Sequence, residues 1–397
     1  MLSRCHFYWK VGGILIHETD DVEVLVVGGG PAGLLTAAYL AERHRVALIE
    51  RGDLGETNKY WLTSLRRLEK HGLQACICYR PKSMIVGTFL GGYLKASGDL
   101  AVVDDKLLMK MLLERCLSRG ALLTGSCSAI NLSWTNSHIQ VNTTSKSYTT
   151  RLVIDASGGL SQIAATFRLH QLDGFFCVYG ALLSKIVLHT ADAVLGHVEH
   201  FGDPPPIFEV FPCGEDAAYC SVFKYSTQLT TPTSLEQIFR THCHHNPFFV
   251  MSDKSETVAA KMGAIPIGRM TRRCLPGILP IGEAGLVQPP LLGSAFNEVL
   301  EYGHDVCAHV SALLASTNGI PSEPRYEYPL VKRVQDRLQL RMIRSLLSGN
   351  VESFDRIVRI LGKLPSETIY DLCSNDLNWT QILLTIARIP LVWRHGD

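Results

Sequence analysis

Residues 22–50 read VEVLVVGGGPAGLLTAAYLAERHRVALIE, and this stretch decides the fold. Its apolar run Val24–Val27 predicts a short buried strand, Leu34–Arg43 has the composition of a helix, and Val46–Ile49 predicts a second strand. The glycines between the first strand and the helix have the spacing G-x-G-x-x-G, and they are Gly28, Gly30 and Gly33. A strand, a glycine loop, a helix and a strand in this order predict the first βαβ unit of a dinucleotide-binding domain.

Each glycine of this loop is expected to have its own steric or conformational role. Gly28 permits the tight turn from strand to helix, Gly30 lets the backbone approach a pyrophosphate, and Gly33 lets the helix pack closely on the strand. The pyrophosphate would lie at the positive N-terminus of the helix, where Pro31 and Ala32 stand.

An acidic residue follows the second strand at the distance that ribose recognition requires. Glu50 stands 22 residues after Gly28, near the spacing at which a carboxylate accepts hydrogen bonds from ribose hydroxyls. Arg51 follows it, and we include both residues in the candidate nucleotide site. A glycine-rich turn of purely structural origin is the alternative.

Two later segments are candidates for the same site. Leu152–Gly158 is an apolar strand that ends in D-A-S-G, and small residues at such a turn would leave room for a cofactor; an ordinary β-turn is the alternative. Ile278–Gly285 is a short strand and turn whose acid could bind ribityl hydroxyls, and a helix over Ala295–Leu314 follows; the alternative is a buried turn before a core helix. The candidate cofactor residues of the two segments are Asp155, Ala156, Gly158, Gly282, Glu283, Pro290, Gly293 and Ser294.

The composition excludes several classes of protein. The 397 residues are 46% hydrophobic and 19% charged, which describes a well-folded chain and not a disordered one. A formal net charge of +1 provides no field for nucleic acid. The twelve cysteines contain no C-x-x-C pair, so we expect reduced thiols and no metal site, and we interpret the cluster 242–245 as a polar loop. These features predict a cytoplasmic protein, soluble or membrane-associated.

The pattern of elements predicts two packed lobes and a helical C-terminal region. We expect an N-terminal extension over 1–20, a nucleotide-binding domain over 21–174 and 263–320, a β-rich substrate domain over 175–262, and helices over 321–397. Helices are also predicted over Trp61–His71 and Lys106–Arg119. A basic face of the C-terminal helices either contacts a membrane surface or is solvated, and its residues are Lys332, Arg333, Arg337, Arg341 and Arg344. The fold class is therefore α/β, a Rossmann-like domain with an inserted β-sheet domain.

Taken together, these segments resemble the lycopene cyclase family of FAD-binding proteins, which is related to geranylgeranyl reductases and aromatic-ring hydroxylases. The resemblance covers most of Val22–Val392 and implies FAD and not NAD as the cofactor. It is carried by VVGGGPAG at Val26–Gly33, TNKYWLTSLRRLEKHGL at Thr57–Leu73, AVVDDKLLMKMLLERC at Ala101–Cys116, VIDASG at Val153–Gly158, VYGALL at Val178–Leu183, and residues from Ile265 to Gly285.

The chain departs from the family at one place. Cyclases of the family resemble one another in a short F-L-E-E-T stretch whose glutamates are implicated in proton transfer to or from the carotenoid, and the corresponding residues here are 219–223, YCSVF. A serine hydroxyl is too weak an acid to replace a carboxylic acid as proton donor to an alkene. Glu209, in the apolar stretch 207–211, could take over this role from an apolar pocket, or strand alternation could point it to solvent.

The sequence predicts a FAD-dependent oxidoreductase, a monooxygenase or a dehydrogenase, that acts on a hydrophobic polyene, isoprenoid or similar specialised-metabolite substrate. Tyr60 and Trp61 are the residues we place beside the flavin ring, and NAD(P)H or a flavin reductase would supply electrons. One alternative is a non-redox flavin-dependent cyclase with a relocated acid, for which Glu209 is the candidate. Another is a catalytically silent flavoprotein that binds a hydrophobic ligand or a partner.

Overall fold

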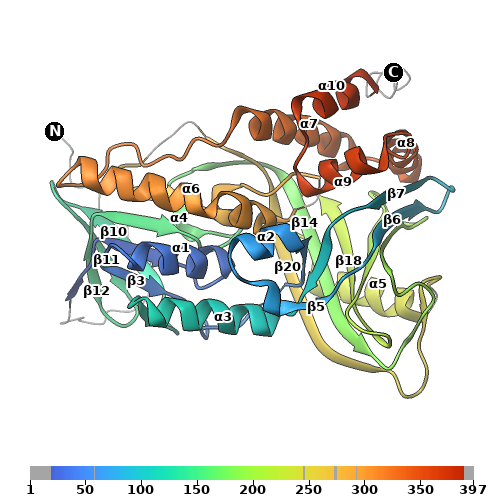
Figure 1. Cartoon of the computed structure of the whole chain (residues 1–397), viewed down its shortest axis with the longest axis horizontal. Coiled ribbons are helices and arrows are strands. Elements are labelled where there is room, and N and C mark those ends of the chain that lie inside the picture. The colour runs from blue at the N-terminus through green and yellow to red at the C-terminus, as the bar shows by residue number, and fades with distance from the viewer. Residues whose placement is uncertain (1–18, 58, 245, 272–274, 292, 389–397) are drawn as a thin grey trace.

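A parallel sheet and a long antiparallel sheet stand side by side in the fold, and the C-terminal helices cover the end of the second sheet (Figure 1). The computed structural model describes residues 19–388 with the exception of 58, 245, 272–274 and 292. The predicted extension over 1–20 therefore lies almost wholly outside the described residues. Its last two residues belong to a strand, β1 (Thr19–Asp21).

Five parallel strands form the sheet of the nucleotide-binding half. Their order is β21 (Ile278–Pro280), β13 (Leu152–Asp155), β2 (Val24–Val27), β3 (Val46–Ile49) and β9 (Leu122–Thr124). Strands β2 and β3 are buried on both faces, which explains why they are continuous apolar runs without polar alternation. The glycine loop joins β2 to α1 (Pro31–Ala41), as predicted.

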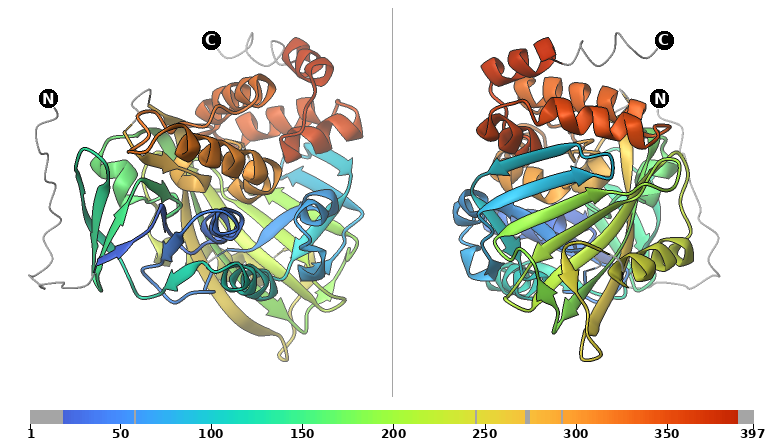
Figure 2. Two further views of the ribbon diagram at one scale, coloured as in Figure 1. Left: turned by 60° about the vertical axis from the view of Figure 1, so that its left-hand side comes forward. Right: turned by 90° about the vertical axis from the view of Figure 1, so that its right-hand side faces the viewer.

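Helices cover one face of this sheet and a small β-meander covers the other (Figure 2). Val24, Val26 and Leu48 pack against the helices α1, α3 (Asp105–Ser118) and α6 (Ala295–Ser316). Leu25 and Ile49 point the opposite way, toward the meander and α4 (Gln162–Thr166). The meander has the order β1, β12 (Ser147–Thr150), β11 (Ile139–Thr143) and β10 (Ala129–Trp134).

Seven strands form the second sheet, which is antiparallel except where β16 and β6 run parallel. It reaches beyond the predicted limits 175–262 at both ends and also takes in residues 83–97. The order is β20 (Glu256–Met270), β14 (His170–Ser184), β18 (Ala217–Ser226), β17 (Ile207–Pro212), β16 (Ala193–Val198), β6 (Ser83–Thr88) and β7 (Tyr93–Ser97). A two-stranded sheet of β15 (Val187–Leu188) and β19 (Phe249–Val250) lies near it.

The predicted helix over Trp61–His71 is wrong in its first part. Residues Trp61–Ser64 form strand β4, which pairs with β8 (Leu100–Val103), and the helix α2 spans only Leu65–Lys70. The Ser64 hydroxyl accepts a hydrogen bond from the Arg67 amide at 3.3 Å, so this serine is the N-cap that fixes the boundary. A short 3-10 turn (Gln74–Cys76) and strand β5 (Ile77–Tyr79) follow.

The predicted polar loop at 242–245 is also wrong for the described residues 242–244, because His242 and His244 belong to helix α5 (Pro232–His244). His242 is buried, and its Nδ1 lies 2.9 Å from Oε1 of Glu199. Burial raises the pKa of Glu199, but hydrogen bonds from His197 and His242 outweigh this and lower it to about 2. His242 is thus part of the packed core of the sheet domain. Residue 245 lies outside the described part of the chain.

The C-terminal region is helical, as predicted. Its helices are α7 (Leu330–Leu346), α8 (Val351–Leu361), α9 (Ser366–Ser374) and α10 (Trp379–Arg388). Apolar residues of these helices form one cluster with Leu94 and Ala96 of β7. In the described part of the chain, no helix has the length and hydropathy needed to cross a bilayer.

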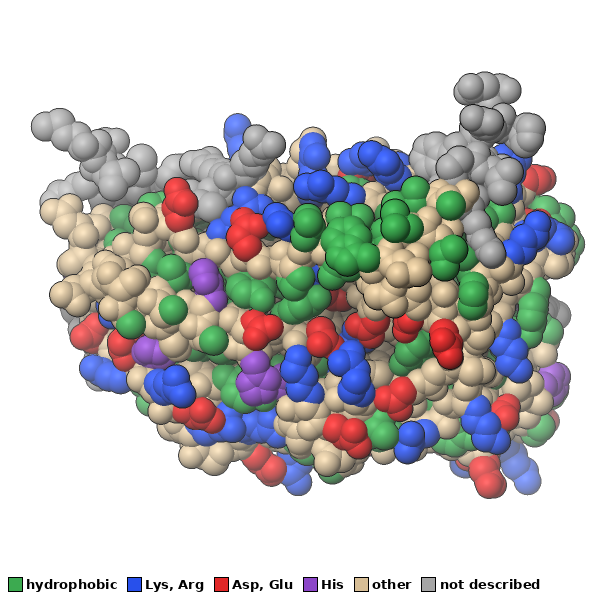
Figure 3. Space-filling view, turned by 45° about the horizontal axis from the view of Figure 1, so that its top comes forward, with side chains coloured by type: hydrophobic (Ala, Val, Ile, Leu, Met, Phe, Trp, Pro, Cys, Tyr) green, Lys and Arg blue, Asp and Glu red, His purple; other side chains and the backbone are tan. Residues whose placement is uncertain are grey.

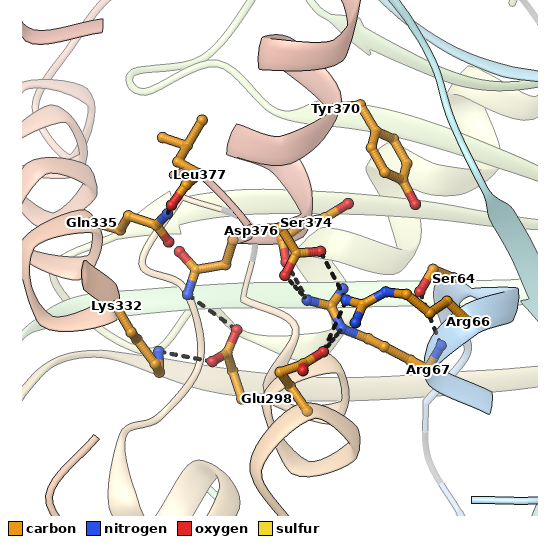
Figure 4. Close-up of polar contacts among 12 residues, drawn as sticks. Ser64, Arg66, Arg67, Glu298, Lys332, Gln335, Tyr370, Ser374, Asp376 and Leu377 are labelled. Carbon is orange, nitrogen blue, oxygen red and sulfur yellow. Dashed lines mark hydrogen bonds and ion pairs between the residues drawn. The ribbon is translucent and has the colours of Figure 1, made fainter. Parts of the chain in front are cut away.

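A network of charges joins these C-terminal helices to the nucleotide-binding half (Figure 4). Lys332, which we predicted on a basic surface, is only 1% exposed, and its Nζ lies 2.9 Å from Oε2 of Glu298. Asp336 is its second ion-pair partner, at 2.9 Å. Arg67, also 1% exposed, donates to Oδ1 of Asp376 at 2.7 Å and to the Ser374 carbonyl at 2.8 Å. Helical periodicity placed Lys332 on the charged face of α7. In the structure α6 packs against this lysine, and the carboxylate of Glu298 compensates its buried charge.

Replacing Lys332 with alanine is expected to lower the free energy of unfolding by about 3–5 kcal/mol, because Glu298 and Asp336 lose the charge that compensates them. Urea unfolding would measure the change. Arg337→Ala on the exposed face of the same helix is the matched control, with an expected change within about 0.5 kcal/mol. Equal effects of the two substitutions would contradict a stabilising role for the buried pair.

Candidate active site

A cavity of about 660 Å³ opens at the carboxyl ends of the parallel strands. The loop after β2, the turn after β13 and the 3-10 turn η2 (Gly282–Gly285) converge on it. In open α/β sheets this edge is where ligands bind. The predicted cofactor residues that line it are Gly28, Gly30, Pro31, Ala32, Glu50, Arg51, Ala156, Gly158, Gly282 and Glu283.

The three fingerprint glycines meet three different surroundings. Gly28 has φ +114°, and a Cβ there would lie 2.3 Å from the Ala156 carbonyl oxygen. A Cβ on Gly33 would lie 1.9 Å from the Gly28 carbonyl oxygen, so this glycine packs inside the fold and does not line the cavity. A Cβ on Gly30 meets no atom within 4 Å. Gly28 and Gly33 are therefore required by the fold, whereas Gly30 faces the space that a ligand would fill.

Glu50 lies at the position predicted for ribose recognition. Its carboxylate accepts hydrogen bonds from the Gly29 amide at 2.6 Å and from the Gly52 amide at 2.9 Å. These bonds hold the side chain at the rim of the cavity, next to the glycine loop. Arg51 lines the same rim and is exposed.

Besides Gly33, two predicted cofactor residues line neither this cavity nor the one described next. The Asp155 carboxylate is fully buried and accepts hydrogen bonds from the hydroxyls of Ser157 at 2.6 Å and Ser161 at 2.5 Å. Burial raises its pKa, and the two hydroxyls partly compensate. Asp155 thus shapes the turn that presents Ala156 and Gly158. Pro290 is buried and lines neither this cavity nor the one described next.

Glu283 forms an ion pair with Lys59, a residue that the sequence did not single out. Its other carboxylate oxygen accepts a hydrogen bond from the Gly159 amide at 3.3 Å. The pair joins residues that are 224 positions apart, so no local pattern could have revealed it. Both side chains lie where this cavity meets a second one.

The residues of the first cavity fit FAD. The open space at Gly30 at the N-terminus of α1 suits a pyrophosphate, and Glu50 and Glu283, the carboxylates predicted to bind ribose and ribityl hydroxyls, both line the cavity. Bound FAD would supply electron and hydride transfer at its isoalloxazine ring. The protein would supply binding, orientation and exclusion of water.

A second, apolar cavity of about 230 Å³ lies between the antiparallel sheet and the nucleotide-binding half. Phe176, Val178 and Phe223 of the sheet form much of its wall, and Tyr60, Gly293 and Ser294 also line it. Trp61 lines both cavities. The residues that the two cavities share are Lys59, Trp61, Met262, Gly263, Glu283, Ala295 and Phe296. A flavin ring at this junction would face the apolar cavity.

Glu209 lines the apolar cavity and does not point to solvent. Within the sheet it stands directly opposite Ser221, whose hydroxyl lies 3.4 Å from Oε2 of Glu209. Burial raises the pKa of Glu209 to about 7, and the hydrogen bond from Ser221 only partly opposes this. Ser221 is one of the residues at the place of the family's glutamates. The chain therefore carries a carboxylic acid on the neighbouring strand, across from the position where the family has its own.

A second polar group at the junction was not predicted from the sequence. Lys261 forms an ion pair with Asp105, and its Nζ lies 4.4 Å from the centre of the Tyr60 ring. Tyr60 stacks on Tyr219 with ring centroids 3.9 Å apart. Burial raises the pKa of both tyrosines, so both remain neutral phenols. Two strands, a helix and the segment before β4 supply these residues, and their proximity depends on the tertiary fold.

One further residue of the apolar cavity carries a buried polar atom without a partner. Asn297, at the start of α6, is 7% exposed and lines the cavity. Its side-chain oxygen has no hydrogen-bond partner among the described residues. In those residues no group of three or more His, Cys, Asp or Glu side chains is arranged to hold a metal ion, and the described cysteines are free thiols.

The chain matches the family described as "Lycopene cyclase protein" over residues 23–392, nearly its whole length. It belongs to the lycopene cyclase family. The family, together with the flavoprotein fold, confirms the prediction of a FAD-dependent enzyme of the oxidoreductase or cyclase kind. The family does not identify the substrate of this member, whose YCSVF stretch lacks both glutamates.

Solved structures confirm the fold class. A geranylgeranyl bacteriochlorophyll reductase-like protein from Thermoplasma acidophilum matches with a TM-score of 0.76 and 17% identity, over 95% of this chain and 98% of that one. A flavoprotein/dehydrogenase from Cytophaga hutchinsonii matches with a TM-score of 0.71 and 12% identity, over 94% of this chain and 98% of that one. The flavin-dependent monooxygenase PieE, solved with FAD and substrate, matches with a TM-score of 0.63 and 16% identity, over 94% of this chain and 72% of that one. At these identities the likeness concerns the fold alone.

A curated relative matches only locally. Thiamine thiazole synthase from Pyrobaculum neutrophilum is 60% identical over 37 residues, which are 9% of this chain and 14% of that protein. The chain thus spans about a seventh of the length of this relative.

Proposed function

We propose that this protein is a FAD-dependent oxidoreductase, a monooxygenase or dehydrogenase, that acts on a hydrophobic substrate of the polyene, isoprenoid or similar specialised-metabolite type. The observation that carries the proposal is the junction of the two cavities, where seven residues line both the cavity at the glycine loop and the apolar one. A flavin ring at the junction would contact a substrate held among Phe176, Val178 and Phe223. Apolar lining with few polar groups is typical of sites for such substrates.

The polar residues of the site have separate roles in this proposal. Glu50 and Glu283 bind hydroxyls of the cofactor, and Lys59 holds Glu283 in place. Tyr60 and Trp61 form the wall beside the flavin ring. Asn297 offers its unpartnered oxygen to a donor group of the substrate or cofactor.

A second candidate is a flavin-dependent cyclase without net electron transfer, and Glu209 favours it. A carboxylic acid that keeps its proton near neutral pH, inside an apolar cavity, is suited to protonate an alkene. The proton would pass from Glu209 to a substrate carbon, and the resulting carboxylate would take a proton back when the product forms. Ser221 would position the carboxyl group.

Consumption of reduced nicotinamide separates the two candidates. If the protein is a monooxygenase, we expect it, loaded with FAD, to depend on a polyene or isoprenoid substrate and on a flavin reductase for coupled oxidation of NADH or NADPH, because the sequence contains no second complete glycine fingerprint for NAD(P)H. Absorbance of the nicotinamide and analysis of the product would measure this. Product that forms anaerobically with no oxidation of nicotinamide and no net change in the redox state of the flavin would reject the oxidoreductase and favour the cyclase, whereas product that forms while FAD becomes reduced would indicate a dehydrogenase.

A further inference from the structure

The last described helix, α10, presents apolar side chains to the outside. Trp379, Leu383 and Ile386 recur at helical spacing and are 49%, 64% and 41% exposed. Leu384 is also exposed, at 44%, whereas Ile382 at the edge of the stripe is 1% exposed. The helix contains no acidic residue. An apolar stripe on an outer helix indicates an interaction surface, since packing among the described residues leaves it exposed.

A row of basic residues stands on the neighbouring helix. Arg333, Arg337 and Arg341 of α7 are exposed, and the last two form no ion pair with another described residue. Helices α7 and α10 lie at the same end of the molecule in both views of Figure 2, and Gln335 of α7 donates a hydrogen bond at 2.6 Å to the Leu377 carbonyl just before α10. Figure 3 shows Lys and Arg side chains gathered along the top of this end, beside hydrophobic ones.

We propose that α7 and α10 form a docking surface for an anionic lipid bilayer. Apolar side chains of α10 would enter the boundary between headgroups and acyl chains, while Arg337 and Arg341 would lie against the negatively charged headgroups. A neutral protein partner or a second copy would match the apolar stripe but not the unpaired arginines. The inference rests on this surface and not on the proposed chemistry.

The position of the surface connects it with the substrate cavity. Cys373 and Ser374, at the end of α9, line the apolar cavity, and α10 begins five residues after Ser374. A hydrophobic substrate dissolved in a bilayer would then be close to the helices that close its cavity. The docking surface would therefore bring the substrate near its cavity as well as attach the protein to the bilayer.

Sedimentation with vesicles tests the proposal on the full chain. We expect the protein to bind vesicles made of equal parts of phosphatidylcholine and phosphatidylglycerol, and to dissociate from them as the salt concentration is raised. Arg337→Glu should weaken binding to these vesicles roughly tenfold and leave binding to pure phosphatidylcholine unchanged. Leu383→Glu should weaken binding to both. Val187→Glu, at an equally exposed residue of β15, is the matched control and should bind as the wild type does.

Light scattering and FAD content accompany each variant. A wild-type protein that stays in solution with anionic vesicles at low salt would overturn the proposal, and so would Leu383→Glu with unchanged binding. A dimer that Leu383→Glu converts to a monomer would assign the stripe to a second copy. Because FAD content is measured separately, failure to bind vesicles by a fully loaded protein would leave the proposed function standing.

Discussion

Replacing Gly30 with leucine is expected to lower the affinity for FAD at least about 100-fold while the apoprotein stays folded. A Cβ at this position meets no protein atom within 4 Å, and the backbone has an extended conformation that any residue adopts, with φ −72° and ψ 178°. The space is therefore free for a side chain until the pyrophosphate arrives. Titration with FAD, followed by flavin fluorescence, would measure the affinity, and thermal unfolding would show that the apoprotein is intact.

Two comparisons separate loss of the cofactor from loss of the fold. Gly28→Ala should lower the unfolding temperature itself, because its Cβ would lie 2.3 Å from the Ala156 carbonyl oxygen and its φ is +114°. Gly214→Leu, in a turn remote from the cavity, is the matched control and should bind FAD normally. Full FAD occupancy in the Gly30→Leu protein would refute the placement of the pyrophosphate at this loop.

The sequence predicted the nucleotide-binding elements because their signals are local. Strand β2, the glycine loop, α1 and β3 are contiguous, and the structure shows directly the steric reason for Gly28 and Gly33. Likewise α3 and α6 have buried faces at helical spacing, and their predicted limits differ from the observed ones by one or two residues. Such segments need no knowledge of the tertiary fold.

The sequence could not predict contacts that form only when distant segments meet. Lys59 pairs with Glu283, Lys261 with Asp105, and Lys332 with Glu298, and the partners are far apart in the chain. Buried or half-buried lysines of this kind have the sequence environment of surface residues. Their roles follow from the carboxylates that other elements bring to them.

Glu209 shows a subtler limit of the sequence. The residues of β17 do alternate, since Phe208 and Val210 are fully buried on one face of the sheet, against α5, and Glu209 points to the other, but the expectation that alternation would point Glu209 to solvent is wrong. Alternation assigns the second face to solvent by default. Here the nucleotide-binding half covers that face and encloses the apolar cavity, so the acid is inside the protein.

For a cyclase in which Glu209 acts as the acid, Glu209→Gln is expected to reduce turnover about 10²–10⁴-fold, because glutamine fills the same space but has no acidic proton. Wild-type turnover should fall as pH rises through about 7, where the carboxyl group of Glu209 loses its proton. Glu215→Gln, in the exposed turn that follows β17, is the matched control and should keep both the rate and the pH profile. An oxidoreductase that needs no internal acid would keep its rate in Glu209→Gln.

The pH dependence of the free energy of unfolding reports the pKa of Glu209 without any substrate. It therefore separates the environment of this carboxyl group from its catalytic role. The pKa of Glu209 is about 7 in the folded protein and about 4.5 in the unfolded chain, so its favourable contribution is present in full below pH 4.5 and is lost as pH rises through 7. Glutamine does not titrate. Urea unfolding at pH 8 should therefore find Glu209→Gln more stable relative to wild type than at pH 4, by up to about 3 kcal/mol. A difference that does not change with pH would show that Glu209 is solvated, and an acid in that environment would have no proton to give an alkene at neutral pH.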